Sequence, residues 1–383
     1  MKVLLWAPLV LGALTLQDME QDAGSTAART TPQDATEAAT SAVASSTVPG
    51  LAVAAYRGGE LISLGAAGVR SAEDETPVTT EDLWHLGSCT KAMTATLAAI
   101  AVEQGLLRFE STLGELLGER DFELHADLVG IRFSQLLDHT SGLANQYGDL
   151  WARYFLDKRP AREVRRELIG TILSQAPEAP PGSRFEYSNF GYIAAGVVLE
   201  ELYDLDWEAL MRRELFEPLG MDSAGFGAPG TAGKLDQPLG HRRGSKGQVP
   251  VPVGPRADNP AWLGPAGTVH ATLEDWGKFL MLHVASLQGE AEKTLLSAET
   301  IARLHTPEEG RDYALGWSVT QRGWAGGLTL THTGSNTTWF AVCWLSPARE
   351  LAVFAATNTA SEDASAACDH AIQLVLADAL KSR

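Results

Sequence analysis

The 383-residue chain carries 48 acidic and 30 basic residues, which gives it a net charge of −18 at neutral pH. This balance argues against partners that are themselves anionic, above all nucleic acids and anionic membrane surfaces. With 45% hydrophobic residues, a chain of this length can bury a large core in one big domain or two coupled ones.

The N-terminus has the pattern of a secretory signal. Met1 and Lys2 precede an apolar run from Val3 to Leu16 that is too short for a comfortable transmembrane helix. We therefore expect residues 1–16 to direct export to the periplasm or the exterior. An uncleaved N-terminal anchor is the second choice and a cytosolic protein the third. Residues 17–36 lack apolar periodicity and are expected to be a linker.

Helical patterns dominate the first two thirds of the remaining chain. A helix is predicted to begin near Thr36, and another near Ser88 that ends at Gly105, a good C-cap. Between them, strands at 51–56 and 60–66 are predicted to form a hairpin across Gly58 and Gly59. The later predicted segments are a mainly helical stretch to about residue 220, a long ordered loop at 228–267 and a helix at 273–287.

Strand character returns near the C-terminus. Strands are predicted at 313–320, 328–332, 338–345 and 351–357, and the box Thr359-x-x-Glu362 indicates a terminal helix to about Leu380. Because strands occur at both ends of the chain, we expect an α/β (α+β) fold in a single domain, residues 37–383. Its α/β lobe would comprise about 37–110 and 255–383, and its helical lobe about 111–254, with the binding cleft between them.

The three cysteines cannot all pair with one another. Cys89 is most simply a small buried side chain. A bridge between Cys343 and Cys368 is geometrically conceivable, and spacing alone leaves it open. The nine histidines show no metal-ligand spacing, so no metal site is expected.

Ser88-x-x-Lys91 is the only Ser-x-x-Lys in the chain. Residues three apart share one face of a helix, so the lysine amine can lie beside the serine hydroxyl. A serine needs such a base to become a good nucleophile, and burial can lower the pKa of a lysine enough to leave it partly neutral. The non-catalytic alternative for this motif alone is a helix start with serine near the N-cap and a solvated lysine.

Two further motifs favour the catalytic interpretation of Ser88 and Lys91. Tyr187-Ser188-Asn189 is the only Tyr-x-Asn and follows a Pro-Gly turn, and His332-Thr333-Gly334 ends a predicted strand before Ser335. Taken singly, Tyr187 could cap a helix start and His332 could be a satisfied histidine at a sheet edge. All three motifs in this order are hard to attribute to chance.

With these motifs, the sequence resembles the serine β-lactamase and penicillin-binding-protein superfamily. The similarity is to the class C-like branch, which includes D-Ala-D-Ala carboxypeptidases, D-aminopeptidases and esterases. It extends from about Val43 to the C-terminus and is supported by residues 136–143, 181–189 and 215–221. The resemblance implies a β-lactamase/DD-peptidase-like fold, an antiparallel sheet flanked by helices plus a mainly helical lobe.

The resemblance also implies roles for individual residues. Ser88 matches the acylated nucleophile, Lys91 its base and Tyr187 the phenol that passes a proton to the leaving group. Asn189 matches the amide that holds Lys91 and a substrate carbonyl. The backbone N–H groups of Ser88 and Ser335 match the oxyanion hole. The substrate-binding set implied in this way is Asn189, His332, Thr333, Gly334, Ser335 and, on a short local match, Gln146.

Two departures from the family pattern bear on the substrate. His332 stands where β-lactamases usually have lysine, so a permanent cation for a substrate carboxylate is missing. Residues 335–339 are bulky where relatives often have glycine. We therefore expect uncharged esters to be preferred over penicillins. With an ordinary histidine pKa of about 6.5, acidification should shift that preference.

These observations predict a serine hydrolase that acts through an acyl-enzyme, without metal or organic cofactor. The expected substrate is a short-chain ester, a D-amino-acid peptide or a peptidoglycan-like fragment. The alternatives are a weak β-lactamase or penicillin-binding protein, and a catalytically silent binding module of the same fold. The oligomeric state stays open.

Overall fold

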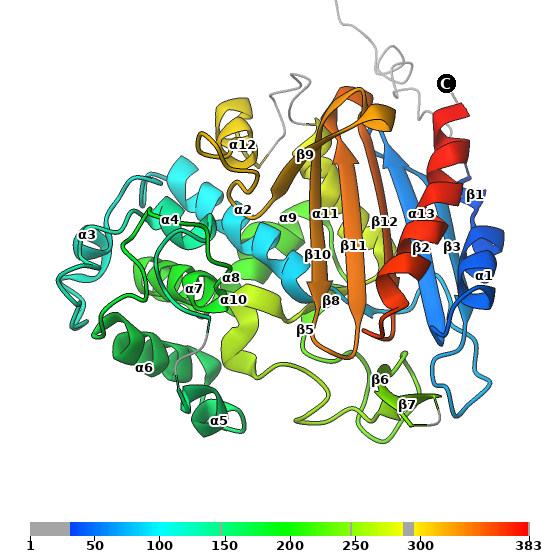
Figure 1. Ribbon diagram of the computed structural model, residues 1–383, viewed down its shortest axis with the longest axis horizontal. Helices are drawn as coiled ribbons and strands as arrows, with labels where there is room; N and C mark the ends of the chain where they lie inside the picture. The colour runs from blue at the N-terminus through cyan, green and yellow to red at the C-terminus, as the bar shows by residue number, and fades with distance from the viewer. Residues whose placement is uncertain (1–30, 146–147, 246, 286–294, 382–383) are drawn as a thin grey trace, which may run out of the picture. The chain divides into compact units, whose positions relative to one another are not determined.

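The computed structural model describes residues 31–145, 148–245, 247–285 and 295–381, and the elements below all belong to one compact unit, Pro32–Arg383. Its central feature is a seven-stranded sheet in the order β1-β3-β2-β12-β11-β10-β9 (Figure 1). Neighbouring strands pair antiparallel, except that β1 and β3 pair parallel. The strands are β1 (Gln33–Asp34), β2 (Gly50–Arg57), β3 (Glu60–Gly68), β9 (Ser318–Arg322), β10 (Gly327–Ser335), β11 (Phe340–Ser346) and β12 (Leu351–Thr357).

Helices cover both faces of this sheet (Figure 1). Helices α1 (Thr36–Ala44) and α13 (Ala364–Lys381) pack on one face, and α11 (Leu273–Ala285) packs against β2 and β12 from the other. Strand β2 shows why both faces can be covered. Its residues 51–56 are all apolar, so the side chains on each face of the strand can be buried. Leu51, Val53 and Ala55 join the core under α1 and α13, whereas Ala52, Ala54 and Tyr56 join the core on the α11 side.

The helical part of the unit is built around two buried helices, α2 (Thr90–Glu103) and α7 (Asn189–Tyr203), which pack against each other. Both are apolar around most of their circumference, which is the pattern of a helix surrounded by protein. The other helices are α3 (Leu113–Leu117), α4 (Phe133–Leu137), α5 (Leu150–Tyr154), α6 (Ala161–Leu173), α8 (Trp207–Met211), α9 (Glu217–Leu219), α10 (Gly264–Gly267) and α12 (Ala298–His305).

Two small sheets complete the described part. Strands β4 (Trp84–His85), β8 (Val269–Ala271) and β5 (Gly225–Phe226) form one, with β8 in the middle. Strands β6 (Gly240–Gly244) and β7 (Gly247–Val251) form the other. Strand β4 matters for the site because it leads directly into the residues around Ser88.

The predicted α/β class and antiparallel sheet flanked by helices are confirmed, but three segments differ from the sequence prediction. Residues 228–267 were expected to be one loop, yet they include β6, β7 and α10. The strand expected at 313–320 begins only at Ser318. The predicted linker includes β1, whose residues pair with Ser63 and Leu64 of β3. Local composition does not show such long-range pairing. The lobe boundaries near residues 111 and 254 stay predictions.

The conceivable bridge between Cys343 and Cys368 is not formed, and all three cysteines are free and buried. Cys343 belongs to the core on the α2 and α11 side of the sheet, and Cys368 belongs to the core under α1 and α13. The two thiols therefore lie on opposite faces of the sheet. Direct bonding requires the two side chains to face each other, so the fold excludes it.

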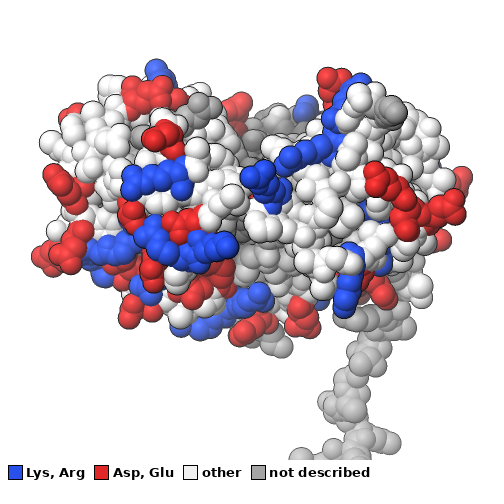
Figure 2. All heavy atoms as spheres, turned by 90° about the horizontal axis from the view of Figure 1, so that it is seen from below, with Lys and Arg blue, Asp and Glu red and all other residues white. Residues whose placement is uncertain are grey.

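No helix of the described part is both long and apolar enough to cross a bilayer. The signal-like residues 1–16 and most of the predicted linker lie outside the described residues. Figure 2 shows one face of the molecule, on which acidic and basic side chains are interspersed rather than gathered by sign.

Candidate active site

Ser88 lies at the point where the chain enters α2. Residues Gly87–Cys89 form a single 3₁₀ turn that continues into the helix. Every residue from Trp84 to Ala101 is buried except Ser88, which is partly exposed. Ser88 is thus the residue of segment 84–101 that is most open to solvent. This is the environment expected of a nucleophile that a substrate must reach.

Lys91 is fully buried one turn further on, with its amine directed at the Ser88 hydroxyl. Its Nζ lies 3.2 Å from Ser88 Oγ, 2.8 Å from Asn189 Oδ1 and 2.6 Å from the Ala266 carbonyl oxygen. The amide and carbonyl oxygens can only accept, so they take two N–H bonds from the amine. The remaining position on nitrogen faces Ser88, where a neutral amine can accept the serine proton.

The surroundings of Lys91 favour that neutral form. Burial lowers its pKa below the ordinary lysine value, while the nearby Tyr187 opposes the shift. The Lys91 Nζ also lies 4.9 Å from the centre of the Tyr187 ring, a contact that favours the charged form. Burial is the larger influence, so the pKa of Lys91 lies below that of a solvated lysine and more of its amine is neutral at a given pH.

Tyr187 directly precedes α7 and is the second side chain that contacts the Ser88 hydroxyl. Its hydroxyl lies 2.9 Å from Ser88 Oγ. The Tyr187 ring packs on His139, with ring centres 4.4 Å apart. The Nδ1 atom of His139 accepts a hydrogen bond from the Ser188 N–H at 3.1 Å. His139 therefore supports both the backbone and the ring that carry the phenol.

The third motif approaches Ser88 through backbone contact, which two glycines make possible. A Cβ added to Gly334 would overlap the Leu86 carbonyl oxygen and lie 2.8 Å from the Ser88 nitrogen. Gly87, at φ +49°, could carry no side chain without overlapping the Ser335 nitrogen. The Ser88 and Ser335 nitrogens thus lie at one junction, as an oxyanion hole requires.

His332 does not present itself to a substrate as expected. Its Nδ1 bonds to the Thr333 carbonyl oxygen at 2.7 Å, and its Nε2 bonds to the Tyr313 hydroxyl at 3.1 Å. The carbonyl can only accept, so Nδ1 carries the proton and Nε2 accepts from the phenol. Burial, reinforced by Lys91, lowers the pKa of His332 to about 4. The imidazole is therefore neutral and fully bonded at neutral pH, whereas Thr333 and Ser335 beside it are exposed.

Gln146, predicted to contact the substrate, lies outside the described residues. Its neighbour Asn145 is described and takes part in the site indirectly. Asn145 Oδ1 accepts a hydrogen bond from the Asn189 N–H at 3.0 Å. The loop before Gln146 thus caps the start of α7 and positions Asn189.

Sequence reasoning missed two groups at the site. The Ala266 carbonyl holds Lys91, and a backbone atom of an alanine leaves no side-chain signal in a sequence. Tyr313 was assigned to a strand, and only the fold shows its hydroxyl on His332. A tyrosine in a short turn carries no pattern that separates it from an ordinary buried aromatic residue.

A pocket of about 730 Å³ lies near this site, although none of the predicted site residues lines it. Asn259 in its wall donates a hydrogen bond to the Gly267 carbonyl oxygen at 2.9 Å. A Cβ added to Gly267 would lie 3.6 Å from both Asn259 Nδ2 and the Gly87 carbonyl carbon, so the pocket wall reaches the residue before Ser88. The lining combines apolar residues such as Phe155, Leu156 and Pro260 with the charged Asp157, Lys158, Arg256 and Asp258.

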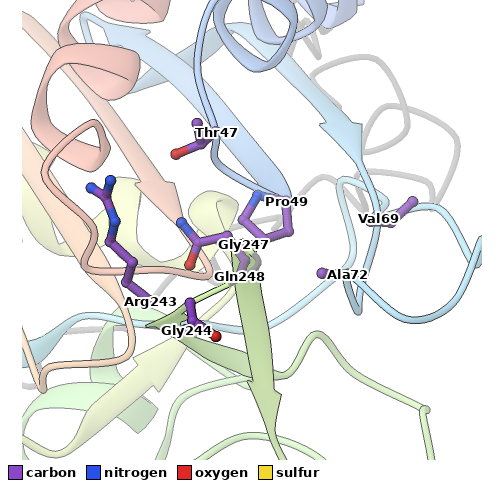
Figure 3. Close-up of a pocket in the computed structure, with 9 residues that line it drawn as sticks. Thr47, Pro49, Val69, Ala72, Arg243, Gly244, Gly247 and Gln248 are labelled. Carbon is purple, nitrogen blue, oxygen red and sulfur yellow. The ribbon is translucent and has the colours of Figure 1, made fainter.

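A second cavity, of about 460 Å³, lies where the β6–β7 hairpin meets the chain around β2 (Figure 3). Thr47, Pro49, Val69, Arg243 and Gln248 are among its lining residues. None of the predicted site residues lines it.

The geometry agrees with the comparison to known proteins. The model of the family described as Beta-lactamase matches residues 34–377. The chain belongs to the Beta-lactamase family. Relatives and structural neighbours that share this fold include a D-aminopeptidase, a D-amino acid amidase and penicillin-binding proteins, so this family member belongs to a superfamily of serine hydrolases.

Individual relatives of this Beta-lactamase family member are distant. It is 28% identical over 286 residues to penicillin-binding protein 4 of Amycolatopsis lactamdurans, covering 74% of this chain and 71% of that protein. It is 29% identical over 247 residues to a D-aminopeptidase of Gluconobacter oxydans, covering 61% of this chain but 42% of the relative. The D-amino acid amidase of Ochrobactrum anthropi has the same fold, with a TM-score of 0.71 at 19% identity over 91% of this chain and 98% of the amidase.

Proposed function

We propose that this protein hydrolyses an uncharged ester or amide through an acyl-enzyme on Ser88. The observation that carries the proposal is the contact of one partly exposed hydroxyl with both Lys91 and Tyr187, at 3.2 and 2.9 Å. Neutral Lys91 takes the Ser88 proton as Oγ attacks the carbonyl, and the Ser88 and Ser335 N–H groups stabilise the oxyanion. Tyr187 then passes a proton to the leaving group, which departs as alcohol or amine.

The second half of the reaction reverses these roles. Water attacks the acyl carbonyl, the Tyr187 phenolate accepts the water proton, and the Lys91 ammonium returns a proton to Ser88 Oγ as the acid is released. The proton count balances over both halves. No residue beyond those already described is required for either half.

The state of His332 supports an uncharged substrate. A neutral imidazole with both nitrogens bonded inside the protein offers no cation to a substrate carboxylate. Short-chain esters meet this requirement. Amides of D-amino acids, which the names of the D-aminopeptidase and amidase relatives favour, carry a cationic amine but no carboxylate, so they are the second candidate.

Intact-protein mass spectrometry after treatment with a fluorophosphonate tests the proposal. Native protein should gain one phosphonyl group, and Ser88→Ala should gain none. Ser183→Ala, which removes an exposed serine from a loop, is the matched control and should label like the native protein. A parallel incubation with penicillin should give slow or no acylation. Absence of label on folded native protein would instead support a silent binding module.

We also propose that the protein is exported, on the strength of the signal-like residues 1–16. N-terminal sequencing of protein from its native host should begin between about Leu16 and Ala28, the interval that the apolar run allows. An intact N-terminus in the cytosolic fraction would contradict export.

A further inference from the structure

A buried carboxylate, that of Asp258, is connected by hydrogen bonds to the segments that carry the two proposed oxyanion donors, the N–H groups of Ser88 and Ser335. Asp258 has a side chain that is 7% exposed and accepts hydrogen bonds from three groups. These are His85 Nε2 at 2.9 Å, Asn336 Nδ2 at 2.7 Å and the Asn259 N–H at 2.6 Å. A buried carboxylate is costly unless its oxygens are satisfied in this way. Both carboxylate oxygens of Asp258 are thus satisfied by a hydrogen-bond network.

One arm of the network runs to the residue before Ser88. His85, which is fully buried, accepts the Gly87 N–H on Nδ1 at 3.1 Å. Since Nδ1 accepts, the ring proton lies on Nε2 and is donated to Asp258. Asp258 thereby fixes both the tautomer and the orientation of the ring that holds the Gly87 peptide.

The other arm runs to the residue after Ser335. Asn336 is 5% exposed, and its side-chain oxygen accepts the N–H groups of Thr338 and Trp339 at 3.1 and 3.0 Å. With its oxygen occupied, the side chain must direct its NH₂ group at Asp258. Asp258 therefore also anchors the turn that follows β10.

We infer that Asp258 is a positioning residue that holds the two oxyanion-hole N–H groups, of Ser88 and Ser335, at their working separation. One carboxylate oxygen acts through His85 on the Gly87–Ser88 segment, and the other acts through Asn336 on the Ser335 segment. The first segment is the turn that leads into α2 and the second is the end of β10, and no covalent link joins the two near the site. The inference rests on the proposed function, because an oxyanion hole has a purpose only in acyl transfer.

Asp258→Asn tests the inference, since the amide keeps the shape but cannot accept from every donor. Donors in an oxyanion hole act on the transition state, so kcat for p-nitrophenyl acetate should fall about 10- to 100-fold with KM nearly unchanged. Affinity for a boronic acid, whose tetrahedral adduct on Ser88 places an oxygen in the hole, should fall by a similar factor. Asp74→Asn is the control: it removes an exposed carboxylate that accepts the Thr76 N–H at 2.8 Å and lies outside the proposed site, so both readouts should stay unchanged.

Loss of kcat together with boronate affinity, at a KM near that of the native protein, supports the inference. Unchanged kcat and boronate affinity in folded Asp258→Asn overturn it while leaving the hydrolase intact. If native protein neither hydrolyses the ester nor binds the boronate, the proposed function and this inference both fail. Should Asp258→Asn not fold, His85→Gln interrupts only the Gly87 arm, and it must show the same paired loss or the inference is wrong.

Discussion

The Tyr187 hydroxyl lies 2.9 Å from the Ser88 hydroxyl, although 99 positions separate the two residues in the chain. Lys91 of α2 contacts the same oxygen, so one serine hydroxyl has both proposed proton-transfer groups within hydrogen-bond distance. The contact joins the start of α7 to the start of α2. These two helices pack against each other in the core. The packing of α2 on α7 therefore sets the distance between the two hydroxyl groups.

Tyr187→Phe should lower kcat/KM about 10²- to 10⁴-fold, the usual contribution of a positioned acid–base group. The ring can still pack on His139, so the thermal unfolding midpoint should stay close to that of the native protein. Steady-state kinetics and thermal denaturation check the two halves of this prediction. Tyr203→Phe, which removes a half-buried hydroxyl bonded to Gln104, is the control and should keep full activity. Equal losses in both variants would remove Tyr187 from the mechanism.

The pH dependence of kcat/KM should report Lys91. Only the neutral amine can accept the Ser88 proton, so activity should fall as the pH drops through the pKa of Lys91. Burial lowers that pKa, which places the acid limb below the ordinary lysine value of about 10.4. Lys91→Arg should be inactive over the whole range, because an arginine stays protonated. A Lys91→Arg protein that keeps the native pH profile would show that another group is the base.

The preference for p-nitrophenyl acetate over a penicillin should be flat from about pH 5.5 to 8, the span around an ordinary histidine pKa. This corrects the expectation drawn from the sequence, because the pKa of His332 is lowered to about 4 and the ring stays neutral throughout that span. His332→Lys should still shift the kcat/KM ratio several-fold toward the penicillin at neutral pH, by supplying a cation. A contact of this kind, if partly exposed, is worth on the order of 1 kcal/mol. A ratio in the native protein that changes around pH 6.5 would contradict this account.

Gly334→Ala should lower kcat by about 10²-fold or more, the cost of losing one oxyanion donor. The added Cβ would overlap the Leu86 carbonyl oxygen, so the Gly87–Ser88 segment and β10 must move apart. Gly323→Ala is the control, since a Cβ there meets nothing within 4 Å. Activity per folded molecule, with the folded fraction taken from circular dichroism, separates lost catalysis from lost stability. Equal activity of the two variants would show that the close approach at Gly334 is not needed.

Several features of the fold and the site followed from local sequence alone. Strand β12 has the predicted bounds, 351–357, because a short apolar run between turn residues is a strong local signal. Ser88 and Lys91 face each other because a spacing of three places them on one helix face, whatever the rest of the protein does. The three motifs were also sufficient to predict the family.

The tertiary structure decided what depends on groups that are distant in sequence. The bond from Lys91 to the Ala266 carbonyl, the bond from Tyr313 to His332 and the assignment of Cys343 and Cys368 to opposite faces have no periodicity that a sequence could show. The pKa of His332 also depends on tertiary contacts. Residue type sets it near 6.5, but desolvation in the assembled core lowers it to about 4. Local sequence determines which residues share a helix or strand face, whereas packing determines how much water each group retains, and that hydration controls its chemistry.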